Sequence, residues 1–102
     1  MVSAARAAAG LIVYDPRGSV KTSATPLAKR LSTLDGKRVA FLDNTKWNAD
    51  NLLRKVAGNL GQEYKLAAVN FYRKECMSWP AEPELVDRIV ANNDVVFEAI
   101  GE

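Results

Sequence analysis

The chain has 102 residues, of which 48% are hydrophobic and 25% are charged, and its formal net charge is +2. This length and composition are typical of one small globular domain. A balance of 14 basic against 12 acidic residues argues against a nucleic-acid-binding protein. No apolar run of about 18 residues is present, so no membrane span is predicted. We expect a cytoplasmic protein, because the first residues lack the long apolar core of a signal peptide.

Histidine is absent from the chain, and Cys76 is its single cysteine. Without histidine the chain lacks the commonest general base and the commonest metal ligand. One cysteine allows no disulfide within the chain. The composition therefore argues against a Ser-His-Asp triad and against a zinc site built from this chain alone. We expect no catalytic and no metal-ligating residue in it.

Residues 1–37 are expected to form an extended N-terminal arm, and residues 38–102 to form the folded domain. The segment LIVYDP, residues 11–16, predicts a short edge strand that ends at Pro16. The rest of the arm is rich in Ser, Thr, Gly, Pro and Lys, which is typical of extended chain with turns. Such an arm is either mobile or lies across another surface. Leucines at positions 27, 31 and 34 favour the second interpretation.

The folded domain is expected to begin with a strand over residues 38–42, RVAFL. Its unbroken apolar run is typical of a parallel strand covered on both faces. A helix is predicted next, because apolar residues recur at helical spacing from Ala49 to Leu60. Asp50 suits the first turn of this helix, where a carboxylate interacts favourably with the helix dipole. We expect Gly61 to end the helix.

The second half of the domain repeats this order. Residues 65–71, KLAAVNF, predict a second strand, and residues 94–100, DVVFEAI, predict a third. Between them, an apolar stripe from Leu85 to Val90 predicts a second helix. Pro83 is expected in its first turn, and Asn92-Asn93 at its end.

The order strand-helix-strand-helix-strand predicts an α/β domain with a three-stranded parallel sheet, of flavodoxin-like or half-Rossmann type. Ligand-binding loops of such folds lie at the carboxyl ends of the strands. The chain stops where the third strand would pass into its loop, so no helix is expected to cover that strand. We expect this half-domain to need a protein partner.

Five polar residues follow the first predicted strand: Asp43, Asn44, Thr45, Lys46 and Asn48. Two interpretations of them stay open. In one, Asn44 or Thr45 caps the next helix, and Lys46 and Asn48 are solvated. In the other, Asn44 and Lys46 point at an anion or a polar small-molecule substrate near the helix N-terminus. The loop then forms part of a substrate site or an interface.

Cys76 follows Arg73 and Lys74 in the loop after the second predicted strand. Neighbouring cations favour the thiolate, so a reactive thiol is one interpretation. The other is an inert cysteine, because no histidine accompanies it. Trp47 and Trp79 both lie in strand-to-helix loops, where we expect them to act as lids or contact surface.

The stretch from Pro26 to Leu53 resembles the bacterial UGSC-motif family, which is named for a selenocysteine-Gly-Ser-Cys or Cys-Gly-Ser-Cys signature. The resemblance lies in a Pro-Leu-Ala-x-Arg-Leu arm, a Leu-x-Gly-Lys turn and a Leu-Asp-Asn-x-Lys-x-Asn-Ala-Asp block. These correspond here to residues 26–31, 34–37 and 42–50. The later segments AEPELVDRI and DVVFEAIGE are also similar to the family, so the resemblance covers the chain from about Leu11 onward.

The resemblance implies a reactive thiol or selenol directly after the third strand, on the loop into the next helix. This chain ends at Glu102, where that signature would begin, and Cys76 does not match it. Two explanations stay open. A selenocysteine codon was read as a stop, or the chain is a true small subunit of a hetero-oligomer. The half-domain and the long arm favour the second.

We therefore expect a small subunit of a hetero-oligomeric bacterial enzyme, which contributes interface and active-site wall to larger partner subunits. A fainter resemblance, in size and type only, is to small accessory proteins of cobalt-dependent aliphatic nitrile hydratases. It implies a lyase reaction with cobalt in the partner subunit and no cofactor bound by this chain alone. The alternatives are a truncated thiol or selenol redox enzyme of the UGSC-like family, and a metal-delivery or assembly chaperone.

Overall fold

The computed structural model describes residues 4–6 and 10–101, which fall into two units divided between Arg30 and Leu31. In the first unit, β1 (Ala4–Arg6) pairs antiparallel with β2 (Ile12–Tyr14). The second strand lies within the segment expected to form an edge strand and ends before Pro16. From Asp15 to Arg30 the chain has no regular secondary structure.

Residues 31–37 belong to the second unit and are tied to it at the turn around Gly36. The Gly36 N–H donates to the Lys65 carbonyl at 2.7 Å, and the Asp35 carboxylate accepts from the Lys65 N–H at 2.8 Å. Gly36 has a φ of 72°, a left-handed conformation that glycine adopts without steric cost. The turn therefore fixes the entry of the chain into the sheet.

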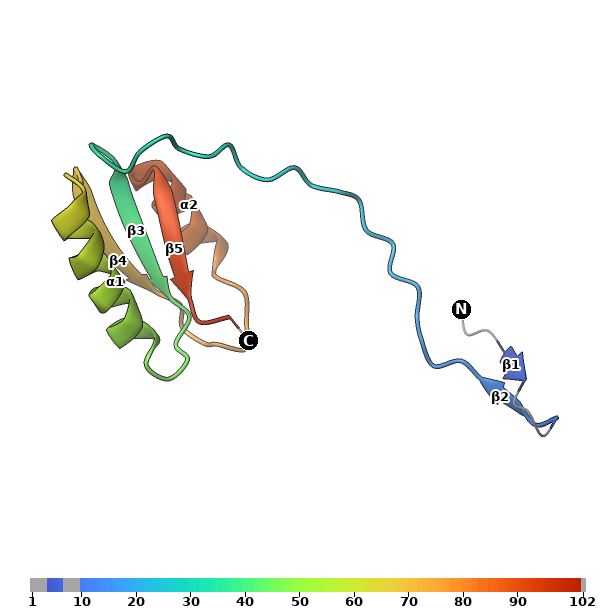
Figure 1. Ribbon diagram of the computed structural model, residues 1–102. Coiled ribbons are helices and arrows are strands. Elements are labelled where there is room, and N and C mark those ends of the chain that lie inside the picture. The colour runs from blue at the N-terminus through green and yellow to red at the C-terminus, as the bar shows by residue number, and fades with distance from the viewer. Residues whose placement is uncertain (1–3, 7–9, 102) are drawn as a thin grey trace. The chain divides into compact units, whose positions relative to one another are not determined.

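The second unit alternates strands and helices around one parallel sheet (Figure 1). Its elements are β3 (Arg38–Asp43), α1 (Ala49–Glu63), β4 (Ala68–Arg73), α2 (Pro83–Asn92) and β5 (Val95–Ala99). The strand order is β4-β3-β5, which confirms the predicted three-stranded parallel α/β fold. The first strand of this sheet, β3, lies in the middle, as in a flavodoxin-like sheet. In half of a Rossmann fold the strand order is 3-2-1, which places the first strand at an edge.

The two helices cover opposite faces of the sheet. Leu53 of α1 packs with Val39 and Phe41 on one face. Leu85 and Ile89 of α2 pack with Ala40 and Leu42 on the other. Successive residues of β3 are therefore buried on both faces, which explains its unbroken apolar run. The flanking strands instead alternate between more and less buried residues.

Three phenylalanines form a row across the α1 face of the sheet. The in-register pairing places Phe41 of β3 opposite Phe71 of β4 and Phe97 of β5. The ring centroids are 5.3 Å apart for Phe41 and Phe71, and 5.6 Å for Phe41 and Phe97. Both pairs are stacked, and the Phe41 side chain is fully buried. We call these residues the phenylalanine row.

Arg38 and Asp94 join the amino ends of β3 and β5. The Asp94 carboxylate accepts from the Arg38 backbone N–H at 2.9 Å and from its guanidinium at 3.1 and 3.2 Å. These hydrogen bonds stabilise the carboxylate and lower the pKa of Asp94 to about 2.

Several predicted element ends differ from the structure, and β4, for example, ends at Arg73 instead of Phe71. α1 continues through Gly61 to Glu63, and Gly61 keeps a backbone that any residue adopts. The helix ends because Tyr64 takes an extended conformation, while its N–H still donates to the Leu60 carbonyl at 2.9 Å. β4 begins at Ala68 instead of Lys65, and the Lys65 N–H donates to the Asp35 carboxylate of the turn before β3. Neither helix of the described residues has the length and apolar character that a membrane crossing requires.

Candidate functional site

The ends of all three parallel strands meet at one edge of the domain. The Lys74 N–H, just after β4, donates to the Asp43 carbonyl at 3.0 Å. On the other side, the Asn44 N–H donates to the Ala99 carbonyl of β5, also at 3.0 Å. The candidate residues after β3 thus lie between the chain segments that leave β4 and β5. This is the edge where parallel sheets place ligands.

Asn44 lies at the junction of β3 and β5 and is 7% exposed. Its side-chain N–H donates to the Ile100 carbonyl at 2.7 Å, and its Oδ1 accepts from the Lys46 N–H at 3.3 Å. Both groups of the amide are therefore used within the protein. The crossover through α1 leads away from this junction to β4, and the crossover through α2 returns to β5. Asn44 accordingly holds together the two strands of the topological switch point.

The segment from Asp43 to Asn48, which we call the polar loop, is held in a strained conformation. Thr45 has a φ of 68°, which is unusual for a β-branched residue. Its N–H donates to the Asp43 carboxylate at 2.7 Å, and its hydroxyl donates to the Asn44 carbonyl at 2.6 Å. These two bonds fix the left-handed turn, and strain of this kind clusters at functional sites.

The N-cap of α1 is Asn48, with a φ of 63° and no side-chain hydrogen bond to the helix backbone. Its Oδ1 accepts instead from the Asn51 side chain at 3.1 Å. The interpretation in which Asn44 or Thr45 caps this helix is wrong, because both bind within the loop and to β5. The first turn of α1 therefore has no side-chain acceptor at its cap, and helix ends of this kind favour polar or anionic groups.

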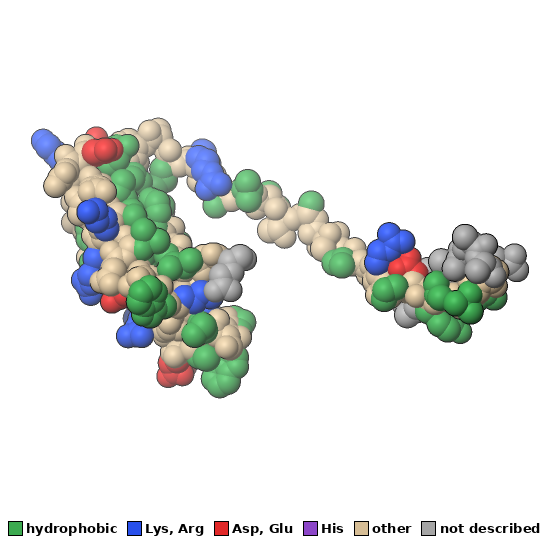
Figure 2. Space-filling model, turned by 60° about the horizontal axis from the view of Figure 1, so that its bottom comes forward, with side chains coloured by type: hydrophobic (Ala, Val, Ile, Leu, Met, Phe, Trp, Pro, Cys, Tyr) green, Lys and Arg blue, Asp and Glu red, His purple; other side chains and the backbone are tan. Residues whose placement is uncertain are grey.

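Lys74 is a buried cation, 9% exposed, in the loop after β4. Its Nζ donates to the Trp79 carbonyl at 2.7 Å, which folds the loop back on itself. Trp79 and Trp47 are 66% and 87% exposed. Figure 2 brings this edge of the domain forward and shows hydrophobic side chains next to basic and acidic ones.

Cys76 is half-buried in the same loop, and its carbonyl accepts from the Trp79 N–H at 3.4 Å. Within the described part of the chain, no hydrogen bond joins its thiol to the polar loop. The described residues also contain no group of three or more His, Cys, Asp or Glu side chains that could hold a metal ion. Cobalt in a partner subunit stays a prediction.

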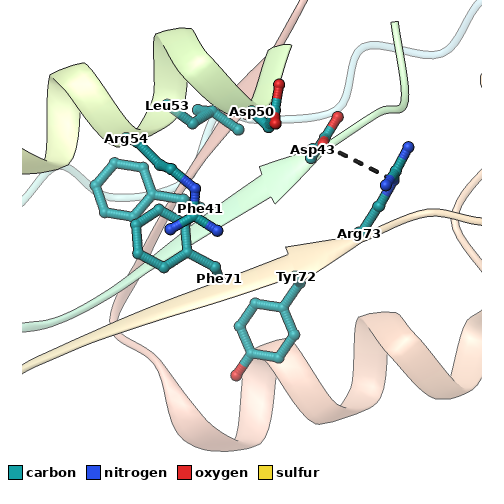
Figure 3. A pocket seen from close by; sticks show the side chains of 8 residues that line it. All are labelled: Phe41, Asp43, Asp50, Leu53, Arg54, Phe71, Tyr72 and Arg73. Atoms are coloured by element: carbon teal, nitrogen blue, oxygen red, sulfur yellow. Dashed lines mark ion pairs between the residues drawn. The ribbon is translucent and has the colours of Figure 1, made fainter. Parts of the chain in front are cut away.

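A pocket of about 260 Å³ lies between α1 and β4, next to the polar loop (Figure 3). The Arg54 guanidinium carbon lies 4.6 Å from the ring centroid of Phe71, and the Arg73 Nε lies 3.9 Å from the Asp43 carboxylate. The pocket is lined by Phe41, Asp43, Asp50, Leu53, Arg54, Phe71, Tyr72 and Arg73. Sequence reasoning missed this pocket, although the spacing of Asp50 and Arg54 places both on one face of the helix.

An apolar groove of about 400 Å³ lies between α2 and β5 on the opposite face. Val86, Val90 and Val96 line it and are 42%, 71% and 48% exposed. Glu98 and Lys74 lie at the same groove. β5 pairs only with β3 among the described residues, so its other edge is open. We call this surface the α2–β5 groove.

Comparisons with known proteins agree with the sequence motifs. Neither the curated proteins nor the solved structures contain a significant match to this chain. The model of the UGSC family matches residues 12–102. This range includes β2, the polar loop and all elements of the parallel sheet. The chain therefore belongs to the UGSC family.

Proposed function

We propose that the chain is a small subunit of a hetero-oligomeric bacterial enzyme of the cytoplasm. In this role it contributes an interface and one wall of a shared active site, and a larger partner supplies the catalytic centre. The observation that carries the proposal is the exposed α2–β5 groove. Contiguous apolar surface of this kind marks interaction sites in soluble proteins.

The energetics of the groove support an interface. Full burial of a valine side chain contributes about 1.5 kcal/mol or more, and Val86, Val90 and Val96 are each at least 42% exposed. The open edge of β5 adds backbone N–H and C=O groups that a partner strand can bind. An interface that covers both features gains apolar burial together with directional hydrogen bonds.

The polar loop supports the second half of the proposal, the active-site wall. Asn44 and Thr45 are fixed by hydrogen bonds, so this part of the loop needs no ordering on binding. Lys46 and Asn48 lie on this loop next to the open first turn of α1. A small polar substrate bound between the loop and a partner would meet preorganised donors. A lyase of the nitrile hydratase type, with cobalt in the partner, is the narrower form of this proposal.

Native mass spectrometry of the protein from its source cells, purified under mild conditions, tests the proposal. We expect this chain in a complex with larger, different subunits. Val90→Lys should remove it from that complex, whereas Leu52→Lys, an equally drastic change at an exposed position of α1, should not. A monomer that is active alone would refute the proposal. A longer chain that carries a selenocysteine or Cys-Gly-Ser-Cys continuation would support the thiol or selenol enzyme instead.

A further inference from the structure

The pocket between α1 and β4 combines opposite charges with an aromatic floor. From this chemistry we propose that it binds a free α-amino acid with an apolar side chain. The proposal goes beyond the subunit function. The pocket lies on the α1 face of β4, away from the α2–β5 groove, and all of its lining residues come from this chain.

Asp50 and Arg54 supply the opposite charges. They are four residues apart on α1, about 6 Å along its axis, where a carboxylate and a guanidinium commonly pair. Among the described residues, however, no ion pair or hydrogen bond engages the Asp50 carboxylate. Arg54 lies over the Phe71 ring instead (Figure 3). A guanidinium stacked on a ring face keeps the N–H groups at its edges available for a bidentate carboxylate.

A second, weaker pair lies at the other end of the pocket. Arg73 and Asp43 are 3.9 Å apart at their nearest atoms, too far for a hydrogen bond, and the Arg73 side chain is 72% exposed. Figure 3 shows Asp50 and Asp43 between the two arginines. The charged groups of the lining thus sum to zero.

This charge balance selects among ligands. An anion that bound both arginines would also face the unpaired Asp50 carboxylate, and a cation at Asp50 would face Arg54. A zwitterion satisfies both groups at once, with its ammonium at Asp50 and its carboxylate at Arg54. In an α-amino acid these two groups are joined by a single carbon, which suits a site whose two charged residues lie about one helical turn apart on α1.

The floor of the pocket selects the side chain. Phe71 is 43% exposed although it belongs to the phenylalanine row, and it supplies the accessible apolar surface of the floor. Leu53 and Phe41 also line the pocket but are only 3% and 0% exposed. The volume of about 260 Å³ is below the range of about 300–1,000 Å³ typical of small-molecule pockets. A single amino acid is therefore a better match than a dipeptide or a nucleotide.

Isothermal titration calorimetry with the full 102-residue chain tests the proposal. The probes are L-phenylalanine, L-leucine, 3-phenylpropionate, which lacks the ammonium, and phenethylamine, which lacks the carboxylate. We expect binding of an amino acid with a Kd below about 1 mM and binding of each analogue about tenfold weaker or worse. The proposal is wrong if neither amino acid binds, or if an analogue binds as tightly as the amino acid.

Two variants make the test specific to the pocket. Arg54→Gln removes the guanidinium and should weaken amino-acid binding about tenfold or more, which is the scale of a lost charge-assisted hydrogen bond. Lys55→Gln makes the same charge change one position along α1, outside the pocket lining, and should leave binding unchanged. Equal losses in both variants would mean general electrostatic attraction and would overturn the proposal. Assembly with partner subunits is measured separately, by native mass spectrometry. The amino-acid site and the subunit function can therefore each be refuted without the other.

Discussion

Replacement of Asn44 by alanine tests how the polar loop is held in place. The side chain is 7% exposed and makes two hydrogen bonds, one to the Ile100 carbonyl at 2.7 Å and one from the Lys46 N–H at 3.3 Å. Alanine removes the side-chain amide and therefore leaves the Ile100 carbonyl and the Lys46 N–H without these hydrogen bonds. A typical net loss is about 1 kcal/mol for each bond, and a buried group left unsatisfied costs about 1–3 kcal/mol. The shorter bond, to Ile100, should account for most of the loss.

We therefore expect Asn44→Ala to lower the free energy of unfolding by about 2 kcal/mol. With a slope of about 1–3 kcal/mol/M, the urea midpoint should fall by about 1 M in a circular-dichroism titration. Asn59→Ala is the matched control. Asn59 is exposed on α1, where alanine is the better helix former, so its midpoint should stay or rise slightly. An Asn44→Ala midpoint equal to that of the control would refute the structural role of this amide.

Four further outcomes follow from other parts of the structure. Phe41→Leu should destabilise the protein by about 2 kcal/mol, because it removes two stacked contacts worth about 0.5–1.5 kcal/mol each. Phe97→Leu removes one such contact and should destabilise the protein by about half as much. Equal urea midpoints for the two variants would contradict the role of the phenylalanine row. Gly36→Ala should cost about 1–2 kcal/mol, since its φ of 72° strains any residue with a Cβ, whereas Gly58→Ala within α1 should not destabilise. The pKa of Asp94 is lowered from 3.8 to about 2 in the folded protein, so the stability that its carboxylate contributes is complete above about pH 4 and is lost as the pH falls through about 2. Arg38→Gln should flatten this part of the curve of unfolding free energy against pH. An unchanged curve would refute the pairing of Arg38 with Asp94. Arg73→Gln should change the free energy of unfolding by less than about 0.5 kcal/mol, because its ion pair to Asp43 is 3.9 Å long and the Arg73 side chain is 72% exposed. A larger loss in a urea titration would contradict this.

The sequence predicted the fold well where burial leaves a periodic pattern. β3 is covered on both faces and reads as an apolar run, and α1 carries a regular stripe that packs on it. Element ends were less predictable, because they depend on partners distant in the chain. The Lys65 N–H, for example, is bound by the Asp35 carboxylate, thirty residues earlier, and no local pattern encodes that bond.

The place of the candidate site was predictable, but its internal geometry was not. Parallel strands bring their carboxyl ends to one edge, so the polar residues after β3 were expected there. The bond from Asn44 to Ile100 spans 56 positions, and it removes Asn44 from the capping role that its local sequence suggests. The pocket at Arg54 was missed for the same reason, because it depends on Phe71 of another strand.

The phenylalanine row also bears on how the chain finds its strand register. Successive residues of a strand point to opposite faces, so a slip of one position would move a phenylalanine from the α1 face to the α2 face. Val69 and Val95, which share that face with Phe71 and Phe97, are too small to restore the stacking after a slip of two. Because β4 is nearer to β3 in the chain than β5 is, we expect Phe41 and Phe71 to meet first. Phe97 would then pack on a pair of strands already in register. A misaligned β5 would be disfavoured because it lacks the stacking contact with Phe41, and not because of a steric clash.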